Sequence, residues 1–205
     1  MKLLIATRNN HKLVEIRQIL AVPSLELIGM EAYDGIPEVV EDGDTFEANA
    51  RKKAVTLALA TGLWTLADDS GLEVDALGGE PGVWSARYAG EPVDYAANNA
   101  KLFAALGNTT HREARFRCVI ALSDPLGRAQ TVEGRCEGAI IHECRGKQGF
   151  GYDPLFVPQG YSETFAEMAS AEKNGISHRG KALRQAAETW ADVFLGGPEA
   201  LARWT

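Results

Sequence analysis

Two long extended segments joined by a short turn constrain the fold more than any other feature of this chain. Residues 114–123 and 129–141 have the pattern of β-strands, and the sequence DPLG lies between them at 124–127. Proline at the second turn position and glycine at the fourth suit a type I turn, so the segments are predicted to form a hairpin. The fold must therefore contain a sheet with antiparallel strands.

Helical and extended segments alternate along the rest of the chain. Short strands are predicted at 2–6, 25–28, 63–67 and 155–157, and helices at 10–20, at 94–106, after 44 and after 177. Asp44 and Glu47 resemble a capping box for the second helix, and Ser177 is a predicted N-cap for the last. The sequence contains no repeat or linker, so we expect one compact α/β domain over residues 1–205 with a mixed sheet.

Composition excludes several classes of protein. With 21 basic and 28 acidic side chains the net charge is −7, which argues against a nucleic-acid-binding surface. It leaves room for one small polyanionic ligand held by a local basic cluster. The sequence has no apolar stretch near the ~20 residues of a membrane span and no secretory signal, so a cytoplasmic location is expected. The three cysteines are predicted to be reduced, with Cys118 a small core residue.

The most informative polar feature is the pair Asp68-Asp69, which follows an apolar run and precedes Ser70-Gly71. We expect the strand to end at this pair. Adjacent carboxylates are disfavoured in a core unless they have partners, and oxygen ligands of this kind suit Mg²⁺. The alternative is that the pair caps a turn, which for an isolated Asp-Asp is the more common situation. Glu41, in the acidic loop before the second helix, is a candidate for a further metal ligand.

Two other clusters could bind phosphate. The first is the segment between the first strand and the first helix, where backbone N–H groups at a helix start attract anions; it consists of Thr7, Arg8, Asn9, Asn10, His11 and Lys12. It lacks the glycines and the GK[ST] ending of a P-loop. The second contains Lys173 and Arg179 beside Ser177. The alternative for the first is a well-capped helix start.

A ligand-facing loop is expected at 149–154, GFGYDP, where an aromatic ring stands between two glycines and can stack on a base. On its own, His178 would be interpreted as a solvated helix residue. Beside Lys173 and Arg179 it fits a pocket that recognises polar groups of a ligand. Carboxylates for a metal, two cationic sites and this loop together predict a Mg²⁺-dependent enzyme acting on a nucleoside polyphosphate.

The order and spacing of these motifs resemble the Ham1/RdgB family of inosine triphosphate pyrophosphatases, over about residues 2–194. The segments that carry the resemblance are TRNNHK (7–12), EDGDTFEANA (41–50), ADDSGLEVDALGGEPGVWSARYAG (67–90), FGYDP (150–154) and AEKNGISHRGKAL (171–183). The resemblance implies an elongated mixed sheet flanked by helices, with two lobes around a cleft that holds the active site. It also implies a homodimer, a Mg²⁺ cofactor and hydrolysis of dITP, ITP and XTP to the monophosphate and pyrophosphate.

The resemblance also implies roles for individual residues. Asp69 is the implied catalytic carboxylate, with Asp68 and Glu41 as further Mg²⁺ ligands. Residues 7–12, Ser70 and Lys173 are implied to contact the triphosphate and sugar. Phe150, Gly151, Tyr152 and Asp153, together with His178 and Arg179, are implied to enclose the base. Arg8 replaces the glycine of many family members, which adds a cation to the phosphate loop.

Two functions are rivals, the first also a nucleotide pyrophosphatase and the second from another class of protein. A Maf-like pyrophosphatase would act on dTTP or modified pyrimidine nucleotides, and a nucleotide-binding module would bind without turnover. The carboxylate set disfavours the second, because a binder has no use for a water-activating Asp69. Since guanine shares the 6-keto group, its exocyclic 2-amino group must be what is excluded.

Overall fold

The computed structural model describes residues 1–33, 35–196 and 204. Within them, six strands form one sheet in the order β2-β1-β3-β4-β5-β6. These are β1 (Lys2–Ile5), β2 (Glu26–Gly29), β3 (Trp64–Val74), β4 (Glu113–Ser123), β5 (Ala129–Ile140) and β6 (Phe156–Pro158). Strand β1 pairs in parallel with β2 and β3, whereas β5 and β6 are antiparallel. The predicted mixed α/β sheet is confirmed.

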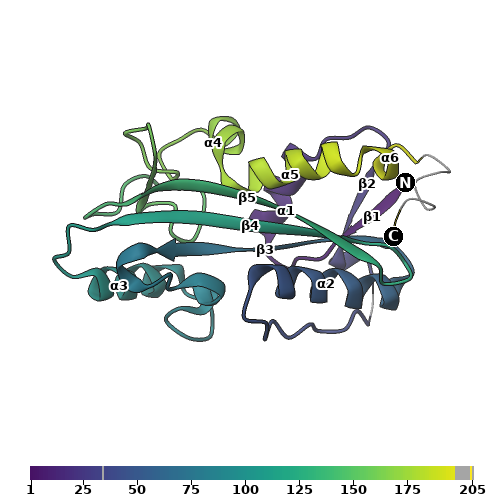
Figure 1. Cartoon of the computed structure of the whole chain (residues 1–205), viewed down its shortest axis with the longest axis horizontal. Helices are drawn as coiled ribbons and strands as arrows, with labels where there is room; N and C mark the ends of the chain where they lie inside the picture. Colours follow the sequence, from purple (N-terminus) through teal and green to yellow (C-terminus); the bar gives the residue numbers. More distant parts are fainter. Residues whose placement is uncertain (34, 197–203, 205) are drawn as a thin grey trace. The chain divides into compact units, whose positions relative to one another are not determined.

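Helices flank this sheet (Figure 1). They are α1 (Asn10–Ile19), α2 (Phe46–Thr61), α3 (Tyr95–Leu106), α4 (Ser170–Ile176), α5 (His178–Thr189) and α6 (Ala191–Phe194), with short 3-10 turns η1 (Met30–Ala32), η2 (Asp75–Leu77) and η3 (Gly82–Arg87). Helix α4 was not predicted from the sequence. None of the described helices has the length and apolar character needed to span a membrane.

The predicted hairpin is formed by β4 and β5, which are neighbours in the sheet. Its connection is closed by the N–H of Gly127, which donates to the carbonyl of Asp124 at 3.0 Å. The Asp124 carboxylate also accepts from the N–H groups of Leu126 and Arg128. Gly127 has a φ of 82°, which a residue with a side chain rarely adopts. The turn residues therefore determine where the two strands reverse.

Contacts within the chain divide it into two compact units. Unit 1 comprises Met1–Asp69, Cys118–Gly134 and Lys181–Thr205, and unit 2 comprises Ser70–Arg117 and Arg135–Gly180. Strands β3, β4 and β5 each contribute residues to both units, because the boundaries fall within them. Each unit has its own apolar core.

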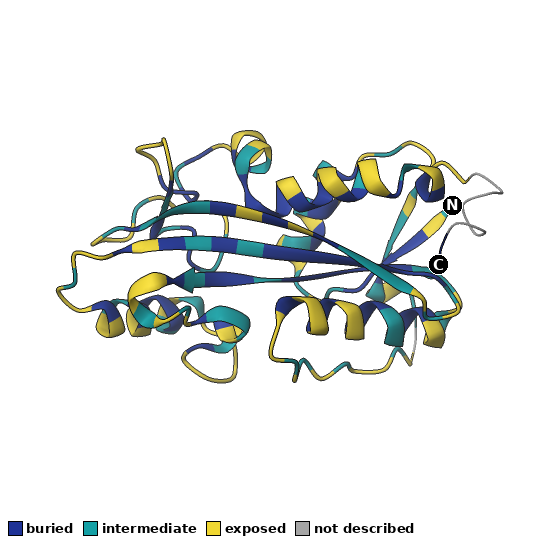
Figure 2. Ribbon diagram, viewed as in Figure 1, coloured by how far each residue is buried: buried dark blue, intermediate teal, exposed yellow. Residues whose placement is uncertain are grey.

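In unit 1 the core lies between the sheet and helices α1 and α5. It contains Leu3 and Leu66 from the strands, Ile16 from α1, and Leu183 from α5. Helix α2 lies on the opposite face of the sheet from α5 (Figure 1). Figure 2 shows the expected pattern on α2 and α5, with one buried side and one exposed side along each helix.

The core of unit 2 contains a cluster of packed aromatic rings. Phe116 of β4 packs against Phe156 of β6 with ring centroids 4.8 Å apart, and Phe156 packs against Phe165 at 5.1 Å. Leu72 of β3 and Leu102 of α3 complete this cluster. Tyr152 of the loop at 149–154 and Leu155, which follows the loop, are buried in this cluster. They anchor the loop on the apolar core of unit 2.

Two sequence-based expectations about local structure are wrong. Strand β3 does not end at the Asp68-Asp69 pair but continues to Val74, so the pair forms neither a strand end nor a turn. The strand tolerates the carboxylates because lysines pair with them. The N-cap of α2 is Thr45, not Asp44, since Thr45 Oγ1 accepts from the N–H of Ala48 at 3.1 Å. Glu47 instead pairs with Arg51.

Candidate active site

The turn between β1 and α1 is held by its own side chains. Asn9 is the N-cap of α1, and its Oδ1 accepts from the N–H groups of His11 at 2.9 Å and Lys12 at 3.3 Å. The N–H of Asn9 donates to Thr7 Oγ1 at 3.1 Å. The capped helix start is therefore present, and two of its N–H groups already have acceptors. Arg8, Asn10 and His11 are exposed, which leaves their side chains accessible to solvent.

Asp68 is the fully buried member of the acidic pair. Its Oδ1 lies 2.5 Å from Nζ of Lys12, and its Oδ2 lies 2.9 Å from Sγ of Cys118 on β4. A buried carboxylate is costly unless it is paired and hydrogen-bonded, and here each oxygen has a partner. The α1 lysine and the β4 cysteine thus fix the orientation of Asp68.

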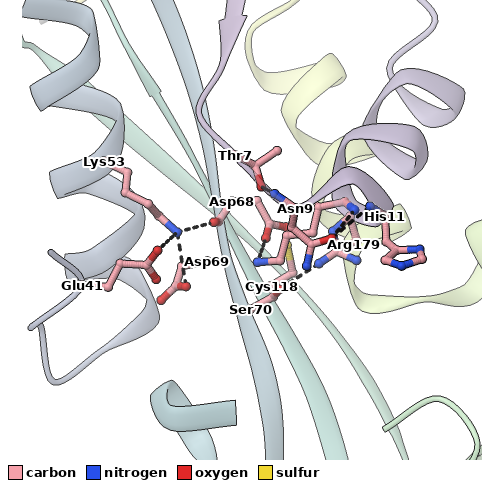
Figure 3. Close-up of polar contacts among 11 residues, drawn as sticks. Thr7, Asn9, His11, Glu41, Lys53, Asp68, Asp69, Ser70, Cys118 and Arg179 are labelled. Carbon is pink, nitrogen blue, oxygen red and sulfur yellow. Dashed lines mark hydrogen bonds and ion pairs between the residues drawn. The ribbon is translucent and has the colours of Figure 1, made fainter. Parts of the chain in front are cut away.

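Asp69 faces the other side of the sheet, because successive residues of a strand point to opposite faces. It meets Lys53 of α2, whose Nζ lies 3.4 Å from Asp69 Oδ1 and 3.2 Å from Glu41 Oε1. The same ammonium donates to the carbonyl of Asp68 at 2.7 Å. Figure 3 shows Lys53 directed at all three acceptors, with Glu41 and Asp69 on the same side of it.

Lys53 was not predicted from the sequence. The signal that could have revealed it is its position on the buried face of α2, where it stands among Ala50, Ala54 and Leu57. A lysine on an otherwise apolar face is rarely buried without an anionic partner. Such a residue indicates that carboxylates lie opposite the helix.

The environment of Asp69 opposes its ionisation. Burial raises the pKa of Asp69 to about 6, with further contributions from the negative charges of Glu41 and Asp68, although Lys53 and Lys12 act in the opposite direction. For Glu41, burial also acts to raise the pKa, but the two lysines outweigh it and the pKa is lowered. One of the two neighbouring carboxylates is therefore a stable anion, and the other can exchange a proton near neutral pH.

The carboxylates offer a partial metal site. No group of three or more His, Cys, Asp or Glu side chains with metal-binding geometry is present among the described residues. Glu41 and Asp69 nevertheless converge, and Asp69 Oδ2 is buried with no hydrogen-bond partner in the described part of the chain. An unpartnered carboxylate oxygen beside a second carboxylate has the donor chemistry that suits Mg²⁺. Asp68, the third expected ligand, turns its oxygens to Lys12 and Cys118.

In unit 2 the loop at 149–154 is built around Asp153. Its Oδ2 accepts from the N–H of Phe150 at 2.9 Å and pairs with Lys173 Nζ at 2.6 Å, both charged side chains being buried. Gly149 has a φ of 72°, and a Cβ placed there would lie 2.0 Å from Asp153 Oδ2. Glycine is thus required at 149 for Asp153 to close the loop.

The aromatic residues of this loop have different environments. Phe150 is partly exposed and has the Lys173 ammonium 5.3 Å from its ring centre, a distance suited to a cation–π contact. Tyr152 is buried and donates its hydroxyl to the carbonyl of Ser85 at 2.9 Å. Burial, with Tyr88 nearby, raises the pKa of Tyr152 above its usual range. Phe150 is therefore the aromatic residue of the loop whose ring is partly exposed.

The start of α5 brings together the remaining predicted residues. Ser177 Oγ accepts from the N–H of Gly180 at 3.1 Å, which confirms the predicted N-cap. His178 is buried and stacks on Phe116 with ring centroids 4.7 Å apart, so the solvated alternative is wrong. Arg179 is almost fully buried and donates to Ser70 Oγ at 2.8 Å. These groups provide a fixed set of polar contacts within unit 2.

The fold and these contacts define a class: a mixed α/β protein with buried carboxylates paired by lysines at β3 and a glycine-bounded aromatic loop. Residues 3–189 match the model of the Ham1 family, and the chain belongs to that family.

Named relatives are similar over nearly the whole chain. A dITP/XTP pyrophosphatase of Desulforamulus reducens is 54% identical, covering 95% of this chain and 98% of its own length. The structure of the Staphylococcus aureus Ham1 protein is 39% identical with a TM-score of 0.85, covering 94% of this chain and 100% of that one. A HAM1 protein from Coxiella burnetii is 40% identical with a TM-score of 0.86, covering 94% and 99%. This family membership was the one that the sequence motifs predicted.

Proposed function

We propose that this protein hydrolyses the deaminated purine nucleotides dITP, ITP and XTP to the nucleoside monophosphate and pyrophosphate. The names of relatives such as the 54% identical dITP/XTP pyrophosphatase support the substrate class. The observation that carries the reaction is the state of Asp69: it is buried, its Oδ2 has no hydrogen-bond partner in the described residues, and its pKa is raised to about 6. A carboxyl of this kind is suited to accept a proton at neutral pH.

In this mechanism Asp69 removes a proton from the attacking water. The water oxygen forms a bond to the α-phosphorus, and the bond from that phosphorus to the oxygen bridging to the β-phosphate breaks, which releases pyrophosphate. Lys53 remains against Asp69 and Glu41 and stabilises the ionised state of the base. We assign to Lys12 and Lys173 the stabilisation of the negative charge that develops on the leaving pyrophosphate.

Glu41 and Asp69 are the residues we propose to hold Mg²⁺, on the side of β3 that faces α2. The bound ion would neutralise phosphate oxygens and lower the pKa of a coordinated water. Asp68 was expected to share this role. Since its oxygens meet Lys12 and Cys118, we assign it chiefly to placing Lys12.

The remaining site residues are assigned by chemistry. Donors of the turn before α1 and Ser70 bind the phosphates and sugar; the turn residues are Thr7, Arg8, Asn9, Asn10, His11 and Lys12. The Phe150 ring stacks on the base, and Gly151, Tyr152, Asp153, His178 and Arg179 shape its surroundings. A donor aimed at a 6-keto oxygen would disfavour adenine, because a 6-amino group leaves donors facing each other.

We further propose that residues 1–205 act as a single domain, that the protein works as a homodimer, and that its location is cytoplasmic. The family resemblance supports the dimer, and the three free cysteines support a reducing location.

A substrate panel tests the proposal. Pyrophosphate release from dITP, XTP, dTTP and ATP is measured with Mg²⁺ present and with the metal chelated. We expect dITP and XTP to be turned over much faster than the other two, and only with metal. Preference for dTTP would favour the Maf-like alternative, and binding of ITP without any release would favour a nucleotide-binding module.

A further inference from the structure

One contact at the acidic pair is not used by the proposed mechanism. Cys118 is fully buried on β4, and its Sγ lies 2.9 Å from Oδ2 of Asp68. The sequence predicted only a small core residue here, and Cys118 does belong to the apolar cluster of unit 1. This contact with a carboxylate oxygen indicates a role for the thiol beyond packing.

The two oxygens of Asp68 are held by different partners. Lys12 lies 2.5 Å from Oδ1, and Cys118 contacts Oδ2, so the carboxylate cannot rotate without losing one contact. A carboxylate oxygen only accepts, and a thiol is a weak donor, so the proton of this contact belongs to the sulfur. Figure 3 shows the Cys118–Asp68 contact among the polar interactions of this region.

We propose that Cys118 is a positioning residue: its S–H donates to Asp68 and sets the orientation in which Asp68 presents Lys12 to the nucleotide phosphates. Cys118 touches neither substrate nor metal in this assignment. The inference rests on the proposed function for the role of Lys12, but the hydrogen bond itself does not. The chain needs a donor at 118, and an apolar side chain of similar size is not sufficient.

Three substitutions separate the hydrogen bond that Cys118 donates from the packing of its side chain. Cys118→Ser keeps a donor in nearly the same volume, Cys118→Val keeps volume without a donor, and Cys118→Ala loses both. Removing a hydrogen bond to a charged group predicts a rise of about fivefold to tenfold in KM for dITP with Val and Ala. We expect kcat to change little and Ser to stay close to the wild-type KM.

A spectroscopic readout tests the contact without reference to activity. The infrared S–H stretch of Cys118 is isolated by subtracting the spectrum of Cys118→Ala from that of the wild type. A stretch shifted below that of a free thiol is expected. Cys136→Ala is the matched control, since Cys136 is also buried and has a backbone carbonyl 3.8 Å from its sulfur. We expect Cys136→Ala to leave the KM for dITP unchanged.

The outcomes distinguish the two proposals. An unshifted S–H stretch, or wild-type KM in Cys118→Val combined with raised KM in Cys118→Ser, would overturn the positioning role and assign Cys118 to packing. A shifted S–H stretch would support the hydrogen bond even if the protein did not hydrolyse dITP. The lack of hydrolysis would refute the proposed function.

Discussion

Asp68 and Asp69 are adjacent in the sequence, yet they have different partners and different chemistry. Asp68 is paired on both oxygens by Lys12 and Cys118, whereas Asp69 keeps one buried oxygen without a partner in the described residues. The cause is the alternation of a continuous strand, which sends the two side chains to opposite faces. Asp69, whose pKa is raised to about 6, is therefore suited to exchange a proton.

At the residue scale we expect Asp69→Asn to keep ITP binding in metal-free buffer but to lose almost all turnover with Mg²⁺ present, because an amide cannot accept the proton of the attacking water. Binding is measured by calorimetry and turnover by pyrophosphate release. A variant with wild-type kcat would remove Asp69 from its role. Asp42→Asn is a control, since Asp42 pairs with Lys52 at the surface.

The raised pKa of Asp69 also predicts how activity depends on pH. Since Asp69 must be ionised to act as a base, kcat/KM should fall as the pH drops below about 6. The profile is measured between pH 5 and 8 at a fixed, subsaturating Mg²⁺ concentration, where the pKa of the metal-free carboxyl governs activity. A rate independent of pH across this range would contradict the assignment.

The same shift makes a prediction about stability. The folded-state pKa of Asp69 lies above its ordinary value of 3.8, so the native state binds more protons than the unfolded state between about pH 4 and 6. Protonated Asp69 therefore contributes its full stabilisation of the folded state below about pH 4. This contribution is lost as the pH rises through about 6. We expect Asp69→Asn to raise the Tm at pH 8 in metal-free buffer and to bring little gain at pH 4.

At the scale of the element, helix α2 matters because it carries Lys53 to the carboxylates. Its N-cap is Thr45 rather than Asp44, and the difference is testable. Thr45→Ala should lower the free energy of unfolding by about 1 kcal/mol, as is typical for loss of an N-cap. Asp44→Ala should have a much smaller effect. Both are measured by urea unfolding, and a larger loss for Asp44 would contradict the assigned cap.

At the scale of the whole molecule, two units with separate cores share three strands. Because β3, β4 and β5 each contribute residues to both units, neither unit can unfold without disrupting strands of the other. We expect one calorimetric transition. Leu66→Ala in unit 1 and Leu155→Ala in unit 2 should each lower the Tm of that transition. Two transitions that respond separately to the two variants would contradict the single-domain proposal.

The sequence by itself determined the α/β class, the hairpin, the capped start of α5, and the family. These depend on local periodicity, turn residues and motif order, all of which are readable along one chain. It also singled out Asp69, in an acidic pair that follows an apolar run, and Lys173 and Arg179, which cluster around the start of a predicted helix.

Only the tertiary structure decided where β3 ends, which oxygen of each aspartate is paired, and that Lys53 and Cys118 belong to this region. A strand can continue through two carboxylates when partners arrive from elements far away in the chain, as Lys12 comes from α1 and Lys53 from α2. The energies of such buried pairs depend on distances between distant residues, and no local pattern encodes them.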